Sequence, residues 1–134
     1  MLLKLRMGTF SYDIAIGTPD GSRFEELSAL VDTGSFYAWL PQSILNRLGV
    51  LPTLHREFET ADGRILAREM AETRVRIDGE ERGTLVIFGD EGTEPLLGAY
   101  TLEGFGLAAD PVNERLIQVG GLIKRMMYGH VQKR

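Results

Sequence analysis

The sequence predicts an all-β fold, either a sandwich or a barrel, with one or two short helices. Many short strand-like runs follow one another closely, Asp-Gly pairs separate several of them, and few segments have helical periodicity. With 134 residues, 43% of them apolar, the chain can bury one core but is short for two. We therefore expect one domain over residues 1–121, followed by a basic tail over residues 122–134.

Two kinds of hydrophobic pattern indicate the strands. Apolar and polar residues alternate at Leu3 and Leu5, over residues 12–16 and over residues 73–77, which is typical of strands with one solvated face. Residues 29–31 and 85–88 are apolar throughout and predict central strands buried on both faces. Residues 107–109 and 115–119 flank a turn at 110–113 and predict a C-terminal hairpin.

Glycine and proline mark the turns and helix ends. Because glycine accepts the positive φ of a tight hairpin, we expect turns at Asp20-Gly21, Asp62-Gly63 and Asp78-Gly79. Residues 41–48 predict a helix that starts with Pro41 and stops at Gly49. A helical turn is expected over residues 101–105, capped by Thr101 and ended by Gly104 or Gly106. Residues 122–127 are compatible with another short helix, although we favour a partly frayed tail.

Composition excludes several classes of function. The formal charge is −4, from 19 acidic and 15 basic residues, and no long basic run is present, so binding to nucleic acid is disfavoured. Without cysteine there are no disulfides, zinc-thiolate sites or cysteine nucleophiles. Charges interrupt the first seven residues, and no apolar run approaches the roughly 20 residues that span a bilayer. We expect a soluble protein of the cytoplasm.

The tripeptide Asp32-Thr33-Gly34 is the strongest candidate for chemistry. It directly follows the apolar run 29–31, so its carboxylate would lie where a core strand becomes a turn. A charged group there needs hydrogen bonds, which the hydroxyls of Thr33 and Ser35 and the N–H of Gly34 can supply. Two interpretations stay open at this point. Asp32 caps a turn, as is common for Asp-x-Gly, or it is a catalytic carboxylate.

Other candidate residues are weaker. His55 and His130 are far apart and have no partner at metal-ligand spacing, so we interpret them as surface histidines and expect no metal site. Ser35 lacks the Gly-x-Ser-x-Gly context and a histidine partner of a serine nucleophile. The aromatic residues at 36, 37 and 39 could line a substrate pocket, although packing is favoured for Trp39.

Three segments together resemble the aspartic protease superfamily. Residues 29–41 resemble its active-site stretch, with an apolar lead-in, Ser35 after Asp-Thr-Gly, and Trp39 and Pro41 as in the N-terminal lobe of pepsin-like enzymes. The segment Leu96-Leu97-Gly98 resembles the element that crosses behind the active-site loop of retropepsin-like domains and precedes a short helix. Residues 57–70, with Asp62-Gly63 at their middle, resemble the β-hairpin flap. The resemblance spans residues 12–119 and is closest in layout to prokaryotic single-domain retropepsin-like proteins.

This resemblance implies a closed retropepsin-like barrel with a flap, and an aspartic endopeptidase that acts as a homodimer. The reaction needs two facing carboxylates, and the chain has only one Asp-Thr-Gly, so two copies of Asp32 would meet across a two-fold axis. The pair would share a proton and activate water, without a covalent intermediate, metal or cofactor. The alternative is a retropepsin-like peptide-binding or dimerisation module with little catalysis, because fold does not guarantee activity.

The resemblance also implies roles for individual residues. Thr33 would brace the two loops across the dimer, Gly34 would donate its N–H to the carboxylate, and Ser35 would hydrogen-bond the outer carboxylate oxygen. Flap residues would bind the backbone of an extended peptide or protein substrate by strand-like hydrogen bonds, and these residues are Ala61, Asp62 and Gly63.

Overall fold

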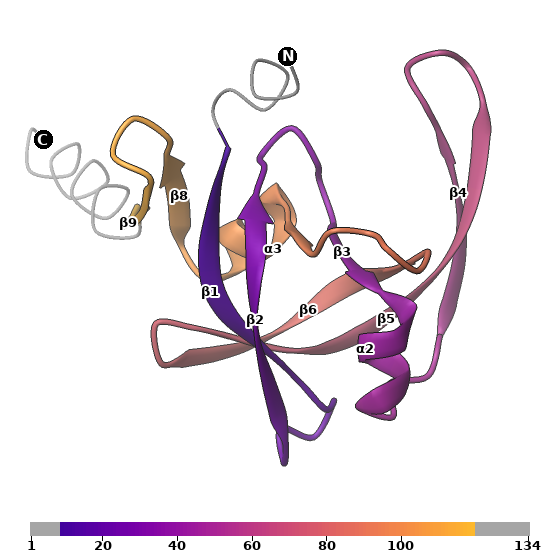
Figure 1. Cartoon of the computed structure of the whole chain (residues 1–134), viewed down its shortest axis with the longest axis horizontal. Helices are drawn as coiled ribbons and strands as arrows, with labels where there is room; N and C mark the ends of the chain where they lie inside the picture. Colours follow the sequence, from indigo (N-terminus) through magenta and orange to yellow (C-terminus); the bar gives the residue numbers. More distant parts are fainter. Residues whose placement is uncertain (1–8, 120–134) are drawn as a thin grey trace, which may run out of the picture.

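The chain forms nine strands and two short helices within residues 9–119, the part that the computed structural model describes (Figure 1). The strands are β1 (Phe10–Gly17), β2 (Phe24–Val31), β3 (Ala38–Pro41), β4 (Leu54–Glu59), β5 (Ile65–Ile77), β6 (Glu80–Gly89), β7 (Leu96–Leu97), β8 (Leu107–Asp110) and β9 (Arg115–Gln118). The helices are α2 (Gln42–Arg47) and α3 (Ala99–Gly104). The predicted all-β class is therefore confirmed.

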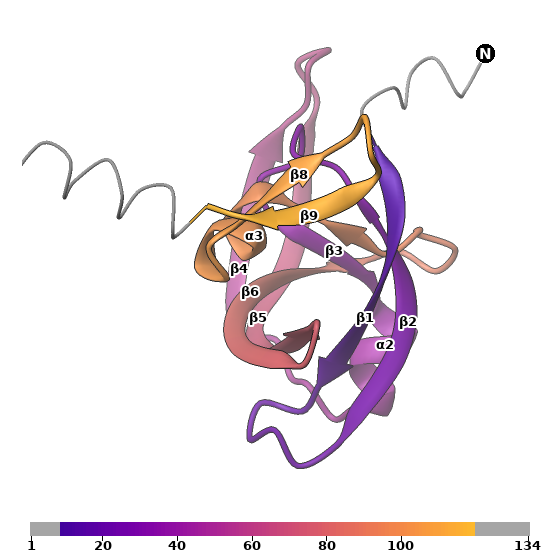
Figure 2. The ribbon, with the colours of Figure 1, turned by 90° about the vertical axis from the view of Figure 1, so that its left-hand side faces the viewer.

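The main sheet brings distant parts of the sequence side by side. Its strand order is β1-β2-β7-β3-β6-β5-β4, and β5 also pairs with β1, with Ala15 opposite Arg76 and Gly17 opposite Arg74. Figure 2 shows β5 and β6 curving round towards β1 and β2. Most neighbouring strands are antiparallel, but β2 pairs with β7, and β3 with β6, in parallel. These parallel contacts join the first half of the chain to the second half.

The core lies where the apolar runs predict it. Ala29 and Val31, at the end of β2, are each 1% exposed, and Val86 and Ile87 of β6 are equally buried. In β5, buried residues alternate with partly exposed arginines over residues 73–77, as the period of two predicts. The C-terminal end of β2 is thus buried on both faces before the chain leaves the sheet.

The hairpins turn at the predicted Asp-Gly pairs. Between β5 and β6, Asp78 and Gly79 both have positive φ, at 52° and 82°, while Ile77 pairs with Glu80. This is the two-residue turn whose twist matches that of the adjoining strands. The Asp-Gly pairs at 20–21 and 62–63 likewise lie in the β1–β2 and β4–β5 connections.

Both predicted helices exist, but their first residues differ from the prediction. Helix α2 starts at Gln42 because Pro41 is still paired in β3, opposite Gly89. Helix α3 starts at Ala99, and the prediction that Thr101 caps it was wrong. Thr101 is 1% exposed, and its hydroxyl lies 2.8 Å from that of Thr84 in β6. The start of α3 is determined by main-chain contacts with the β2–β3 loop, which short-range sequence rules do not include.

The predicted C-terminal hairpin is present as β8 and β9, a separate two-stranded sheet with Leu107 opposite Gln118 and Asp110 opposite Arg115 (Figure 2). The expected strand around Leu3 and Leu5, and the expected features of residues 122–134 with His130, lie outside the described residues.

The buried hydroxyl pair of Thr84 and Thr101 gives a test of the packing between α3 and β6. We expect Thr84→Val to lower the free energy of unfolding by about 1–3 kcal/mol, because it leaves the other hydroxyl buried without this partner. The double variant with Thr101→Val should lose less than the sum of the two single variants, since no orphaned hydroxyl remains. Urea unfolding of the four proteins measures this, and additive losses would contradict a direct hydroxyl contact.

Candidate active site

Asp32 is the first residue after β2 and begins the loop of residues 32–37 that leads into β3. Its backbone N–H donates to the carbonyl of Leu97 in β7, at 3.0 Å, so the loop is fixed to the sheet at its first residue. Its side chain is half-buried, and it directly follows the fully buried Val31. The carboxylate therefore lies at the boundary between core and solvent, as the sequence predicts.

The carboxylate of Asp32 is oriented by its own loop. The N–H of Gly34 donates to Oδ1 at 3.0 Å, and the N–H of Ser35 donates to the Asp32 carbonyl at 3.1 Å. A side chain on residue 34 would place its Cβ only 3.1 Å from Oδ1, so glycine gives the carboxylate room. Within the described residues Oδ2 has no hydrogen-bond partner. Asp32 thus caps its turn through one oxygen and leaves the other available.

The neighbouring hydroxyls have different surroundings. Thr33 is exposed, and the structure shows no partner for it within residues 9–119. The hydroxyl of Ser35 donates to the carbonyl of Tyr37 at 2.9 Å, whereas the resemblance implied a bond to the outer oxygen of Asp32. A hydroxyl has a single proton to donate, so in this arrangement Ser35 braces the loop and does not donate to the carboxylate.

The segment Leu96-Leu97-Gly98 passes directly behind the Asp32 loop. β7 lies between β2 and β3, with Leu97 opposite Val31 in parallel pairing and Leu96 opposite Trp39 in antiparallel pairing. The N–H of Leu30 extends this ladder by donating to the carbonyl of Pro95 at 2.8 Å. The strand before the loop and the strand after it are thus both fixed to β7.

Gly98 is where the backbone of the loop comes closest to this crossing segment. A Cβ at Gly98 would lie 2.6–2.7 Å from the carbonyl oxygens of residues 35, 36 and 37. Two of these carbonyls accept hydrogen bonds from the start of α3, from Ala99 N–H to Ser35 at 2.9 Å and from Tyr100 N–H to Phe36 at 2.8 Å. The first turn of α3 is therefore capped by the Asp32 loop, and only glycine allows the approach.

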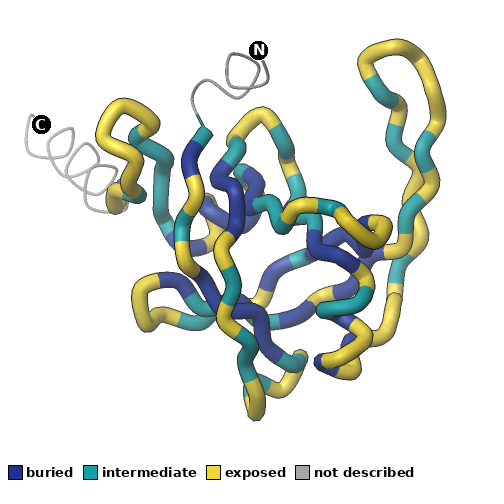
Figure 3. The backbone as a smooth tube through the Cα atoms, in the orientation of Figure 1, coloured by how far each residue is buried: buried dark blue, intermediate teal, exposed yellow. Residues whose placement is uncertain are grey.

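The segment that resembles a flap, residues 57–70, lies in the β4–β5 hairpin. Figure 1 shows it projecting from the body of the molecule on the same side as the loop between β2 and β3, and Figure 3 shows its tip as exposed. At the tip, Thr60 and Arg64 are joined by a main-chain hydrogen bond of 2.8 Å, and Ala61, Asp62 and Gly63 turn the chain between them. The pKa of Asp62 is lowered, mainly by a hydrogen bond from the Thr60 hydroxyl and also by hydrogen bonds from Arg64.

One face of the hairpin is turned towards the body. Phe58 pairs with Leu66 across the hairpin, and its ring lies 6.1 Å from that of Tyr37 and 6.3 Å from that of Trp39. On the same face, Arg68 donates to Asp90 at 3.0 Å, which links the hairpin to the loop before β7. The hairpin is therefore fixed to the body at Phe58, near the end of β4, and at Arg68, and the tip residues 61–63 beyond them are exposed.

The described residues offer no arrangement suited to a metal ion, since no three histidine or acidic side chains gather in a suitable way within 9–119. His55 instead contacts Glu69 across the hairpin, at 2.6 Å. In the same part of the chain, neither helix is long and apolar enough to cross a membrane.

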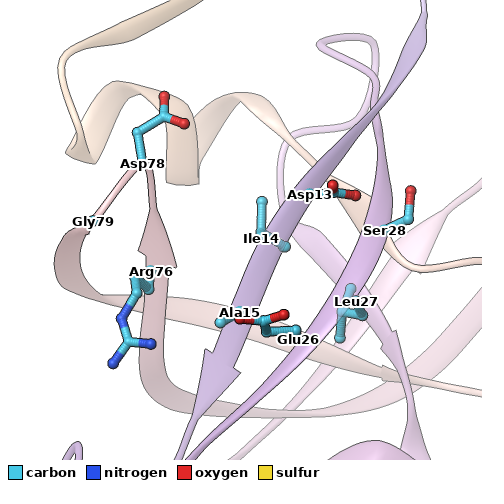
Figure 4. Close-up of a pocket in the computed structure, with 9 residues that line it drawn as sticks. All are labelled: Asp13, Ile14, Ala15, Glu26, Leu27, Ser28, Arg76, Asp78 and Gly79. Carbon is cyan, nitrogen blue, oxygen red and sulfur yellow. The ribbon is translucent and has the colours of Figure 1, made fainter.

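A pocket of about 400 Å³ lies on another surface, formed by β1, β2 and the β5–β6 turn (Figure 4). Asp13, Glu26, Ser28 and Asp78 contribute polar groups to its lining. Beside it, Tyr12 donates its hydroxyl to Asp78 at 2.9 Å, and burial, together with this carboxylate, raises the pKa of Tyr12. No residue of the Asp32 loop lines this pocket, so it is separate from the candidate active site.

A group of aromatic residues was only partly anticipated by the sequence. Phe36, Tyr37, Trp39, Phe58 and Tyr100 come from the Asp32 loop, β3, β4 and α3, and their rings form a continuous series of contacts. We call this group the aromatic cluster. Packing of Trp39 agrees with its half-buried position. The roles of Phe58 and Tyr100 could not be foreseen, because strand pairing and the crossing of β7 bring them to the loop.

The comparisons with known proteins agree with this geometry. Residues 17–101 match the family described as aspartyl protease. This match spans more than half of the 134 residues and includes the Asp32 loop, the β4–β5 hairpin and Gly98. The chain belongs to the aspartyl protease family. A search of curated proteins found no match.

The fold is similar to two solved viral proteases. One is the solution structure of the simian foamy virus (mac) protease, with TM-score 0.52 and 16% identity over 70% of this chain and 92% of that chain. The other is the EIAV protease complexed with the inhibitor HBY-793, with TM-score 0.54 and 19% identity over 72% of this chain and 88% of that chain. At these identities the likeness concerns the fold, which is retropepsin-like.

The contact at Gly98 gives a prediction for the integrity of the site. Gly98→Ala should lower the free energy of unfolding by at least about 2 kcal/mol, because its Cβ meets three backbone oxygens that cannot move independently. Gly104→Ala is the matched control, since nothing lies within 4 Å of its Cβ, and it should be neutral or slightly stabilising. Urea unfolding measures both variants. Equal stability of the two variants would contradict the close approach.

Proposed function

We propose that the chain is one half of a homodimeric aspartic endopeptidase, with Asp32 as the catalytic residue. The observation that carries this proposal is the state of its carboxylate: half-buried, oriented through Oδ1 by the N–H of Gly34, and unbound at Oδ2 within the described residues. Membership of the aspartyl protease family supports the reaction class.

A second carboxylate of the same kind is not found within the chain. Of the other aspartates, Asp13 is exposed on β1 and Asp110 ends β8, while the rest lie in turns and loops, namely Asp20, Asp62, Asp78 and Asp90. Asp90 also follows a buried strand, but its side chain is 79% exposed and paired with Arg68. Since the reaction needs two facing carboxylates, a two-fold axis beside Asp32 would supply the second from another copy of the chain. The exposed Thr33, next to Asp32, is available to contact the partner's loop.

The chemistry we propose is attack by water on a peptide carbonyl. Two carboxylates close together do not both ionise readily, so the pair holds one proton. The ionised carboxylate takes a proton from water as the water oxygen bonds to the carbonyl carbon. The protonated carboxyl group gives its proton to the carbonyl oxygen, and a diol forms. The carbon–nitrogen bond then breaks as the nitrogen takes the proton that the first carboxylate received from water. The second carboxylate takes a proton back from one hydroxyl of the diol, and the products are an acid and an amine.

The substrate we propose is a peptide in extended conformation, held between the Asp32 loops and the hairpins. β4 is the last strand of its sheet and has one edge without a strand partner in the described residues. An extended peptide can use such main-chain groups for strand-like hydrogen bonds. The exposed tip residues Ala61, Asp62 and Gly63 are the proposed contacts above the cleaved bond.

The first test is removal of the carboxylate charge. Asp32→Asn should reduce kcat/KM for cleavage of denatured protein by about 10²–10⁴-fold, because the amide cannot accept the proton of water. Asp13→Asn, which changes an exposed aspartate on β1, is the matched control and should cleave like the wild type. Gel and mass-spectrometric assays from mildly acid to neutral pH measure the rates.

Two outcomes of this assay would count against the proposal. Cleavage by Asp32→Asn at the wild-type rate would remove the mechanism. A folded wild-type dimer that cleaves nothing would favour the alternative, a peptide-binding module.

The second test concerns the dimer. Sedimentation velocity should show a dimer at tens of micromolar, and the cleavage rate per chain should rise with protein concentration through the range where the dimer forms. This dependence follows because one chain holds only one carboxylate of the pair. Full activity per chain in a sample that sediments only as monomer would refute the shared site.

A further inference from the structure

We infer that Arg56 and Arg68, on the inner face of the β4–β5 hairpin, form a subsite for an acidic side chain of the substrate. This inference rests on the proposed function and names a preference of the same site. The inner face is the one that carries Phe58 and Leu66 and is turned towards the body. A carboxylate bound there would lie between the hairpin and the body, where we propose that the extended peptide binds.

The two arginines occupy directly opposite positions of the hairpin. Arg56 of β4 pairs with Arg68 of β5, one rung before the pair of Phe58 and Leu66. Side chains at opposite positions lie on the same face of a sheet, and their Cβ atoms are about 4.5–5.5 Å apart. Like charges at such positions repel each other. A negative charge added between them would therefore be favourable.

The hairpin has a basic inner face and an acidic outer face. Successive side chains of a strand point to opposite faces, so Glu57 and Glu69, next in sequence to the two arginines, lie on the outer face. On that face Glu69 contacts His55 at 2.6 Å. Neither glutamate therefore lies on the side of the arginines. Although the chain has a net charge of −4, the hairpin presents positive charge to the body.

The structure supplies one carboxylate for the two guanidinium groups. Asp90, in the loop before β7, accepts a hydrogen bond of 3.0 Å from Nη2 of Arg68, and its side chain is 79% exposed. Nη1 of Arg68 donates to the carbonyl of Ala67 at 2.9 Å, and the buried Nε has no acceptor in the described part of the chain. Arg56 is exposed and has no ion pair within residues 9–119. One positive charge of the pair is thus left without a counter-ion.

The two arginines differ in a way that suits recognition. The side chain of Arg68 is 20% exposed and held by Asp90, whereas Arg56 is exposed and accessible to a ligand. A substrate carboxylate would accept a charge-assisted hydrogen bond from Arg56, and the charge of Arg68 would add to the attraction. An uncharged side chain of the same shape would gain much less.

The position of the pair places the subsite beside the cleaved bond. Phe58, in the next rung, contacts Tyr37 of the Asp32 loop, with 6.1 Å between the ring centroids. Neighbouring rungs on one face of a strand are about 7 Å apart, and the arginines lie on the side of Phe58 that is away from the hairpin tip. The acidic residue would therefore be bound on the flank of the proposed cleft, at some residues from the bond that is cleaved.

The first test compares cleavage of a proteome-derived peptide library by the wild type and by Arg56→Gln. The wild type should favour Glu and Asp at one position, and for two peptides with Glu or Gln there we expect a kcat/KM ratio of about five. The ratio should fall to about one in Arg56→Gln and be largely kept in Arg56→Lys, which retains the charge. Arg82→Gln, which removes a positive charge from a half-exposed residue at the start of β6, should keep the wild-type ratio.

A binding measurement separates this inference from the proposed function. Asp32→Asn is titrated with acetylated and amidated decapeptides of alanine and serine, in which one Glu or one Gln is moved through the positions. Glu should bind about fivefold more tightly than Gln at one position. The difference should disappear when Arg56→Gln is added, and it should shrink as NaCl is raised to about 0.5 M, because salt screens exposed charges. This result supports the subsite even if the wild type cleaves nothing.

Asp90→Asn should change the preference in the opposite direction. Without the carboxylate of Asp90, the arginines attract a substrate carboxylate more strongly, so the ratio of Glu to Gln binding should exceed that of the parent protein. If the ion pair only held the hairpin in place, both peptides would bind more weakly by the same factor. Equal affinity for Glu and Gln peptides at every position, or no binding of either, overturns the inference, as does a preference that Arg56→Gln leaves unchanged. Cleavage by the wild type that is lost in Asp32→Asn would still support the proposed function in those cases.

Discussion

The close approach of Gly98 to the Asp32 loop is the contact on which the candidate active site depends. Three carbonyl oxygens of the loop lie 2.6–2.7 Å from where a Cβ at Gly98 would be, and two of them accept hydrogen bonds from the first turn of α3. A loop that leaves a buried strand has main-chain groups that need partners. Here the helix supplies them, and in return the loop caps the helix. One glycine makes both possible.

The Asp32 side of the site is held by more main-chain contacts than the hairpin side. Behind Asp32, β7 pairs with both β2 and β3, so the carboxylate is attached to the centre of the sheet. Opposite it, the β4–β5 hairpin extends past the body and is held by Phe58, near the end of β4, and by Arg68 with Asp90 (Figure 1). A carboxylate attached to the sheet and an exposed hairpin would suit the proposed reaction, which has to orient a water molecule and admit a peptide.

The sequence predicted those parts of the fold that follow from local chemistry. The Asp-Gly turns, the buried lead-in to Asp32 and the N–H of Gly34 at the carboxylate all depend on residues a few positions apart. The start of α3, the partner of the Ser35 hydroxyl and the β1–β5 pairing depend on segments far apart in the sequence. The role of Gly98 was indicated only through the family resemblance. Its physical reason, a lack of space beside three carbonyls, required the structure.

The aromatic cluster shows why contacts between distant segments are harder to derive from sequence than a short motif. The proposed reaction needs one short motif, and that motif is contiguous. The cluster is assembled from the loop, β3, β4 and α3. In the sequence, each of its aromatic residues taken alone is what ordinary packing would require. Strand pairing and the crossing of β7 bring these rings together, with Phe36 and Tyr100 exposed and Phe58 against Trp39. Neither contact follows from residues a few positions apart.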